Sequence, residues 1–310
     1  MAYEWNSEMR PLFLTALTII LVMQFPARRS SARIQHGHSL LEVGHASRLN
    51  TPPKAPDEIK VVSFNIRWRG GDDLKKLAQL FKTDAELGGA TILGLQEVDR
   101  NRKRTRNANT VKVLAEELGM YYAWAAPPGV PGEKEEETGV AILSSYPLSH
   151  VHRLVLPHAG PGGRRRAAVG ATVTIGLQKL RVYSVHSENR ISVTKKLQQY
   201  RAVLTAAQHF DKDSPTIVLG DLNTWEGDAV DKTTKLFAEA SFDTPFNNSS
   251  TFRRQILFVP IEFKLDWMWF RNLTASSHGI DREVGLSDHW PLWAVVPLAT
   301  ARENTNAGTK

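Results

Sequence analysis

Six short hydrophobic runs in this chain each end in a carboxylate, an amide or a histidine, and this recurrence limits the folds that the chain can adopt. Each run has the length and apolar content of a buried β-strand. A buried polar side chain is costly unless it has a partner, so six such strand ends predict one shared site. The polar residues at these ends are Asn65, Glu97, His186, Asp221 with Asn223, Asp266, and Asp288 with His289.

The chemistry of these residues narrows the kind of site. Carboxylate and amide oxygens are the ligands that a hard divalent ion prefers, which indicates Mg²⁺, with Mn²⁺ as an alternative. Histidines beside such an ion suit acid–base chemistry on a phosphate ester. Because the chain contains no cysteine, a thiolate metal site and a disulfide framework are excluded.

In this order the motifs resemble those of the endonuclease/exonuclease/phosphatase superfamily, which includes pancreatic-type deoxyribonucleases, abasic-site endonucleases, neutral sphingomyelinases and inositol-phosphate phosphatases. The resemblance extends from Ile59 to Pro297. One such motif occurs by chance, whereas six in the family's order are a specific signal. The resemblance implies a four-layer α-β-β-α sandwich, with two packed mixed sheets flanked by helices and the site at one end. It also implies hydrolysis of a phosphoester bond by an activated water.

The pattern between the motifs agrees with an α/β protein that has mixed sheets. Amphipathic helices are predicted over residues 72–86, 109–118, 192–210 and 229–240. Asn109 begins the second of these helices and Gly119 follows it as a C-cap, while Ser192 is the predicted N-cap of the third. A single strand is predicted over 263–270, and Trp267 and Trp269 within it are expected to pack in the core.

The chain of 310 residues divides into a catalytic domain and two ends. Residues 59–298 contain all the motifs without a linker-like break, which predicts one domain. Residues 33–58 are polar and contain prolines, as a linker would, and 299–310 form a predicted polar tail.

Residues 1–32 contain an apolar run, 11–25, that stops at Pro26 before two arginines. The run is short for a membrane span and suits the core of a signal peptide. An uncleaved membrane anchor and a buried N-terminal helix are the alternatives. We therefore expect a protein that is exported to a periplasm or the exterior, or anchored in a membrane.

The resemblance assigns the metal to three residues. It places Glu97 as the principal carboxylate ligand, Asn65 near the metal or the scissile phosphate, and Asp288 as a further ligand. Some relatives carry an acidic residue two positions after this asparagine, where this chain has Arg67. That departure favours one catalytic ion.

The resemblance also assigns catalytic roles. Asp221 would orient or deprotonate the attacking water, and Asn223, which points the same way at the strand end, would donate to the phosphate. His289 would be a general base or a phosphate-binding imidazole, and Asp266 would hold its far nitrogen. His186 would be a second catalytic histidine, with Glu137 as its expected support.

Two basic clusters remain, in a chain whose formal net charge is +7. Residues 100–106 directly follow Glu97 and are expected to flank the site. Arg165 and Arg166, in a run of three arginines, are candidates for binding the substrate phosphate. The positive charge favours an anionic partner.

The motifs recognise the phosphate and leave the rest of the substrate open. A nucleic acid is the first expectation, because each phosphate contact from Lys or Arg adds affinity. A phospholipid, a small phosphoester or an inositol phosphate at a membrane surface is the alternative, favoured by the apolar N-terminus and by the motif around His186. We expect a monomer.

Overall fold

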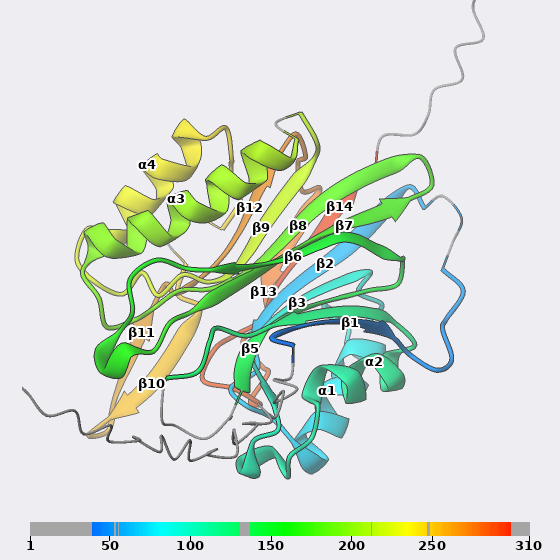
Figure 1. Ribbon diagram of the computed structural model, residues 1–310, viewed down its shortest axis with the longest axis horizontal. Coiled ribbons are helices and arrows are strands. Elements are labelled where there is room, and N and C mark those ends of the chain that lie inside the picture. Colours follow the sequence, from blue (N-terminus) through cyan, green and yellow to red (C-terminus); the bar gives the residue numbers. More distant parts are fainter. Residues whose placement is uncertain are drawn as a thin grey trace, which may run out of the picture. The chain divides into compact units, whose positions relative to one another are not determined.

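Two β-sheets packed face to face carry the residues of the predicted site (Figure 1). The computed structural model describes residues 39–52, 54, 56–130, 137–211, 213–246 and 249–298. The predicted signal or anchor segment and the predicted tail lie outside these residues. Within them, no helix has the length and apolar content needed to cross a membrane.

The larger sheet of the described chain has seven strands and the smaller has five, and a separate hairpin makes a third, two-stranded sheet. The larger sheet has the spatial order β1 (Leu41–His45), β4 (Tyr121–Ala125), β5 (Glu137–Ser144), β3 (Ile92–Arg100), β2 (Glu58–Asn65), β14 (Leu292–Pro297) and β13 (Ser277–Ile280). The smaller has the order β12 (Asp266–Arg271), β9 (Thr216–Asp221), β8 (Gln178–His186), β7 (Ala167–Ile175) and β6 (Leu148–Val155). The hairpin consists of β10 (Phe252–Ile256) and β11 (Val259–Phe263). Both large sheets are mixed, because β2 pairs with β3 and β8 with β9 in parallel while the other pairs are antiparallel.

The facing sides of the two sheets form the central core. Ile92 and Ile142 of the larger sheet and Val182 and Leu219 of the smaller belong to this buried cluster. The two sheets lie close together at Gly94, since a Cβ there would lie 1.9 Å from Leu219 Cδ1. The sheets can therefore pack at this distance only because position 94 has no side chain.

Helices cover the outer faces of both sheets (Figure 1). Helices α1 (Gly71–Thr83) and α2 (Thr110–Leu118) pack on the larger sheet, and α3 (Val193–Phe210) and α4 (Ala229–Glu239) on the smaller. The predicted four-layer α-β-β-α architecture is confirmed, and the core positions of Trp267 and Trp269 are confirmed as well.

Local sequence correctly predicted both ends of α2 and the N-cap position of α3. Asn109 caps α2 by accepting a hydrogen bond from Lys112 N at 3.3 Å, and Gly119 adopts the left-handed conformation at the C-cap, with φ of 63°. Ser192 occupies the N-cap position of α3, but its side chain makes no capping hydrogen bond.

Several elements differ from the sequence expectation. Strand β1 lies inside the predicted linker, so the sheet begins before Ile59. Its five residues are too few to show a strand period, and pairing with β4 decides the conformation. The predicted strand 263–270 is divided, because β11 ends at Phe263 and β12 begins at Asp266.

Strand pairing brings the polar strand ends to one edge. In the parallel pairs, Asn65 is opposite Gln96 and His186 is opposite Asp221. In the antiparallel pair β12–β9, Asp266 is opposite Asp221. The carboxyl ends of β2, β3, β8 and β9 and the start of β12 therefore converge.

Candidate active site

Asp221 is the hub of the converging polar residues. Its Oδ2 accepts a hydrogen bond from Asn65 Nδ2 at 3.0 Å, and its Oδ1 accepts from the backbone N–H of Asn223 at 3.0 Å. Burial raises the pKa of Asp221 to about 7, and the nearby carboxylates act in the same direction against the charge of His289. A carboxylate with such a pKa can accept a proton from water near neutral pH.

His289 is oriented by Asp266 and Thr251. Its Nδ1 lies 2.8 Å from Asp266 Oδ2, which also accepts from Thr251 Oγ1 at 2.8 Å. Thr251 Oγ1 itself accepts from the backbone N–H groups of Leu265 and Asp266, so its own proton is directed to the carboxylate. These contacts direct the Nδ1–H of His289 to Asp266. They leave His289 Nε2 facing Asp221, with 3.8 Å between Nε2 and Asp221 Oδ2.

The charge state of His289 follows from its neighbours. Burial lowers the pKa of its imidazole, but the charges of Asp266 and Asp221 outweigh burial and raise the pKa to about 10. The two carboxylates therefore favour the charged form of His289, which suits a donor to a phosphate oxygen better than a general base.

His186 approaches Asp221 from the other side. Its Nε2 lies 3.5 Å from Asp221 Oδ2, and its side chain is buried. Burial, together with the charges of Arg166 and His289, holds the pKa of His186 well below its ordinary value. A neutral imidazole in this position can donate a hydrogen bond without adding positive charge.

A β-bulge aims Glu97 into the site. The register of β3 against β5 shifts between Gln96 and Val98, and Glu97 has a φ of 57°, which a non-glycine residue rarely adopts. Burial raises the pKa of Glu97 against the opposing effects of His289, Arg166 and a hydrogen bond from Asn65. Its Oε2 is buried with no hydrogen-bond partner among the described residues.

Two sets of side chains are candidates to hold a divalent ion. Asp221, Asp266 and His289 offer ligand atoms within 4.8 Å of one another. Both oxygens of Asp221 and Asp266 Oδ2 already accept hydrogen bonds within the network, whereas Asp266 Oδ1 is buried with no partner among the described residues. Glu97 Oε2 is likewise buried and unpartnered, which suits a cation ligand, so Glu97 could also hold the ion.

Asp288 lies beside this position and is half-buried. Its Oδ2 is 3.3 Å from Arg67 Nη1. Arg67 thus places a positive charge where some relatives have a carboxylate, as the sequence indicated.

Asn223 is held in place by groups behind it. It has a φ of 52°, and its Nδ2 donates to the carbonyl of Ser187 at 3.1 Å. The buried ammonium of Lys196, on α3, donates to the Asn223 carbonyl at 2.8 Å and pairs with Glu226 at 3.1 Å. Lys196 is a positioning residue that the motifs did not reveal.

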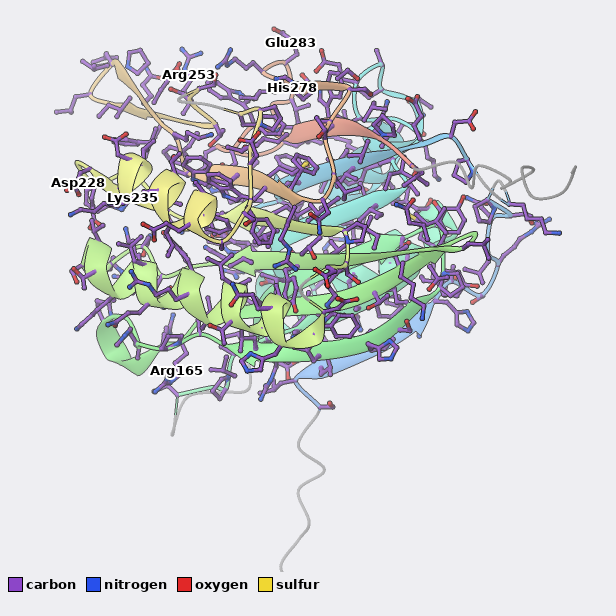
Figure 2. All side chains as sticks on the ribbon, turned by 90° about the horizontal axis from the view of Figure 1, so that it is seen from above. Arg165, Asp228, Lys235, Arg253, His278 and Glu283 are labelled. Carbon is purple, nitrogen blue, oxygen red and sulfur yellow. The ribbon has the colours of Figure 1, made fainter. Side chains whose placement is uncertain are left out.

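The structure separates the two candidate arginines. Arg166 lines the cavity, where its Nε donates to Glu188 Oε2 at 3.1 Å. Arg165 is exposed on the loop before β7, and Figure 2 shows it at the outer edge of the view. Of the two, Arg166 alone lines the cavity.

Glu137 does not support His186, so this prediction is wrong. Its Oε2 accepts from Arg100 Nε at 2.5 Å, and Arg100 also pairs with Glu42 at 2.7 Å and lies 4.2 Å from the Trp124 ring centroid. Antiparallel pairing places Glu137 opposite Arg100, away from the end of β8. Asp221 is the acidic neighbour of His186 instead.

Only part of the basic cluster at residues 100–106 is exposed on the surface of the protein. Arg100 is buried in the ion pairs just described, and Arg104 pairs with Asp99 at 2.7 Å while it stacks on Trp68 at 4.1 Å. Lys103 and Arg106 are exposed. The cluster flanks the site as expected, because Arg104 stacks on Trp68 and Trp68 lines the cavity.

The polar groups form the floor of a cavity of about 390 Å³. One wall is apolar and comes from the β10–β11 hairpin and the segment after it. Two half-exposed tryptophans, Trp68 and Trp225, also line the cavity. Sequence reasoning missed these residues, although Trp225 closely follows the motif at Asp221. The lining residues of the hairpin wall are Phe252, Arg254, Ile261, Phe263 and Leu265.

Comparison with known proteins agrees with this geometry. The family model described as "Endonuclease/Exonuclease/phosphatase family" matches residues 62–289. None of the curated proteins compared with the chain is significantly similar in sequence.

Solved structures share the fold at low sequence identity. An endonuclease/exonuclease/phosphatase family protein from Leptotrichia buccalis is 15% identical, covers 77% of this chain and 100% of its own, and has a TM-score of 0.61. D. rerio TDP2 complexed with single-strand DNA product is also 15% identical, with 78% and 100% coverage and a TM-score of 0.61. An endonuclease/exonuclease/phosphatase from Bacteroides vulgatus is 17% identical, with 79% and 100% coverage and a TM-score of 0.61. The chain belongs to the endonuclease/exonuclease/phosphatase family of divalent-metal-dependent phosphoester hydrolases.

Proposed function

We propose that the protein is a phosphodiesterase in which a water held by Asp221 attacks phosphorus in line with the leaving group. The observation that carries this proposal is the buried network of Asp221, His289 and Asp266 beside the unpartnered Glu97 Oε2. A diester is favoured because the cavity continues past the catalytic residues to an apolar wall and two tryptophans, which gives room for a group on each side of the phosphate.

Each residue has a task in this scheme. Asp221 takes a proton as the water oxygen bonds to phosphorus. The bond from phosphorus to the leaving oxygen breaks on the opposite side, and this oxygen departs with the bonding electron pair and takes a proton from solvent. The His289 imidazolium and the neutral His186 donate to phosphate oxygens, and Asn223 donates its amide as charge accumulates. Hydrolysis needs no covalent enzyme intermediate.

We assign the metal to Glu97, with Asn65 and Asp288 beside it, and propose a single Mg²⁺, for which Mn²⁺ could substitute. When bound, the ion neutralises charge on a phosphate oxygen. Arg67 supports the single-ion proposal, because its guanidinium already neutralises Asp288 at 3.3 Å.

The proposal is tested by hydrolysis of bis-p-nitrophenyl phosphate with Mg²⁺ or with EDTA. Asp221→Ala and His289→Ala should each reduce turnover by about 10²–10⁴-fold, as general acid–base groups do. His278→Ala, an exposed histidine on the edge strand β13, is the matched control and should not change turnover. Near-normal turnover by either folded active-site variant would remove the mechanism.

For the substrate, we propose a nucleic acid first. Lys103 and Arg106 are exposed beside the Arg104–Trp68 stack at the cavity. If both bind phosphates, Lys103→Ala/Arg106→Ala should flatten the log-salt slope of KM on DNA by about two units, at roughly 0.9 for each lost contact. Lys179→Ala, exposed at the start of β8 and therefore at the opposite end of that strand from His186, should leave the slope unchanged.

A phospholipid or a small phosphoester is the second candidate. The apolar hairpin wall, formed by Phe252, Ile261 and Phe263, favours a substrate with an apolar part. A screen of sphingomyelin, phosphoinositides, plasmid DNA and RNA distinguishes the two candidates. Parallel salt slopes for the double variant and the wild type would move the assignment to this second class.

We also propose that the protein is exported or membrane-anchored and works as a monomer. The apolar run 11–25 supports the first part. Mass spectrometry of the native N-terminus should find a mature end shortly after this run, or an intact N-terminus in the membrane fraction. A soluble cytosolic protein that begins at Met1 would contradict export.

A further inference from the structure

The β10–β11 hairpin presents large apolar side chains to solvent at its tip. Ile256 pairs with Val259, which leaves Leu257 and Phe258 as a two-residue turn. Leu257 is 87% exposed, Phe258 90% and Val259 61%. Figure 1 shows the hairpin extending away from both large sheets, which agrees with this exposure.

The turn itself does not account for these residues. Both central positions have positive φ, 45° at Leu257 and 72° at Phe258. A two-residue turn of this kind strongly prefers Asn-Gly, because a leucine or phenylalanine with positive φ is strained. The chain accepts this strain at two positions whose large apolar side chains are almost fully exposed, which indicates that the side chains have a use.

The size of the tip argues for a lipid surface and against a stable protein interface. Three apolar side chains bury roughly 500 Å² at most, whereas each partner in a stable protein complex buries about 800 Å². An interfacial membrane element needs only a few apolar residues that reach about 5–10 Å into the lipid.

Charge at the hairpin agrees with a lipid surface. Arg253 and Arg254 are exposed on β10, against one acid, Glu262, on β11. Arg253 lies near the outer margin of Figure 2, on the hairpin. Basic residues next to inserted apolar residues are placed to meet lipid phosphates.

The hairpin is continuous with the catalytic cavity. The Phe252 ring packs against the His289 ring with centroids 4.9 Å apart, and Arg254, Ile261 and Phe263 line the same cavity. The five residues of β10 span roughly 17 Å, so the tip and the catalytic residues lie about one strand length apart.

We propose that the β10–β11 hairpin docks the enzyme on a phospholipid bilayer by inserting Leu257, Phe258 and Val259 between the headgroups. Docking holds the cavity next to the headgroup layer. The proposal concerns where the enzyme works and goes beyond the proposed function, because it does not depend on which phosphoester is cleaved.

A single-cysteine probe tests insertion in the full chain, which has no cysteine of its own. Phe258→Cys is labelled with an environment-sensitive fluorophore and mixed with vesicles of phosphatidylcholine containing phosphatidylglycerol. Leu177→Cys is the matched control, because Leu177 is 92% exposed in the turn between β7 and β8, at the opposite end of those strands from the site. We expect a blue shift and quenching by spin-labelled lipid at position 258 but not at 177. This difference would persist even if another part of the chain tethered the protein to the vesicle.

A second variant separates docking from catalysis. Leu257→Asn/Phe258→Gly introduces the residues that this turn prefers, so the hairpin should form at least as well. We expect this variant to lose at least about tenfold in vesicle affinity while its turnover of soluble bis-p-nitrophenyl phosphate stays normal. If the proposed function fails, neither protein will hydrolyse the soluble diester, while the vesicle readout still reports docking.

Three outcomes would overturn the proposal. A label at position 258 that remains water-exposed on vesicles would exclude insertion. Unchanged vesicle binding by the Asn-Gly variant would show that the tip does not contribute to docking. A label that is already buried in a dimer without lipid, seen by sedimentation, would assign the tip to a protein contact.

Discussion

Replacing Asp266 with asparagine tests whether the charge behind His289 matters, because the substitution preserves shape and removes only the carboxylate. In the structure, Asp266 Oδ2 accepts two hydrogen bonds, from His289 Nδ1 and from Thr251 Oγ1, each at 2.8 Å. An amide oxygen in the same place keeps both contacts. The bond then has one charged partner, His289, instead of two, and we expect it to weaken by about 1–2 kcal/mol.

The expected magnitude has two parts. Loss of the charge should reduce turnover by about 5–30-fold, since 1–2 kcal/mol of stabilisation is lost if His289 is charged in the transition state. Asp266 Oδ1 is buried and has no hydrogen-bond partner among the described residues. The amide NH₂ would therefore be an unpaired buried donor and cost about 1–3 kcal/mol of stability. If the amide instead turns its NH₂ toward His289, two donors face each other and the hydrogen bond to Nδ1–H is lost. Turnover should then fall by up to about 10⁴-fold.

The pH dependence gives an independent readout. The charge of Asp266 helps to hold the pKa of His289 near 10, so Asp266→Asn should lower that pKa toward its ordinary value of 6.5. The alkaline limb of the kcat profile on bis-p-nitrophenyl phosphate should therefore move to lower pH. Thr251→Val keeps the charge of Asp266 and removes the three hydrogen bonds of Thr251 Oγ1, one to Asp266 Oδ2 and two from backbone N–H groups. It is the control and should shift the limb much less. A folded Asp266→Asn enzyme with wild-type turnover and an unmoved alkaline limb would refute the role given to Asp266.

Three further predictions test other parts of the structure. Glu97→Gln should raise the Mg²⁺ concentration for half-maximal activity at least about tenfold, because the amide keeps the shape but loses the charge; an unchanged metal titration would exclude Glu97 as a ligand. Burial lowers the pKa of Lys264 from 10.5 to about 7, so its burial costs stability increasingly as pH falls from 10.5 to 7. Lys264→Met should accordingly raise Tm by several degrees near pH 6 and by little near pH 10, and calorimetry showing the same gain at both would contradict this. Arg166→Gln should raise KM by about tenfold while Arg165→Gln leaves it unchanged, because only Arg166 lines the cavity; equal effects in steady-state kinetics would disprove the distinction.

The sequence by itself determined which residues favour burial and which polar residues can be buried only with a partner. The hydrophobic runs that end at Asn65, His186 and Asp221 can lie in a core only if their polar ends share partners, and this requirement predicted one site. Local chemistry also set the caps of α2 at Asn109 and Gly119, because capping depends on residues adjacent in the chain.

Tertiary structure decided which polar groups meet. From the sequence, the carboxylates of Glu137 and Asp221 were both available as partners of His186. Strand pairing places Glu137 opposite Arg100 and Asp221 opposite His186. The bulge that aims Glu97 into the cavity likewise arises from the β3–β5 register and leaves no mark in a local pattern.

The same distinction explains the basic residues and the hairpin. In the sequence Arg100, Arg104 and Lys103 are alike, yet the fold buries the first in ion pairs, stacks the second on Trp68 and leaves the third exposed. The cavity wall formed by Phe252 and Phe263 exists because their strands pair across a two-residue turn, which places distant residues on one face. The preference of a residue for burial depends on its own side chain, so it can be inferred from the sequence. The partner that a polar side chain meets depends on how the strands pair, and only the fold specifies that.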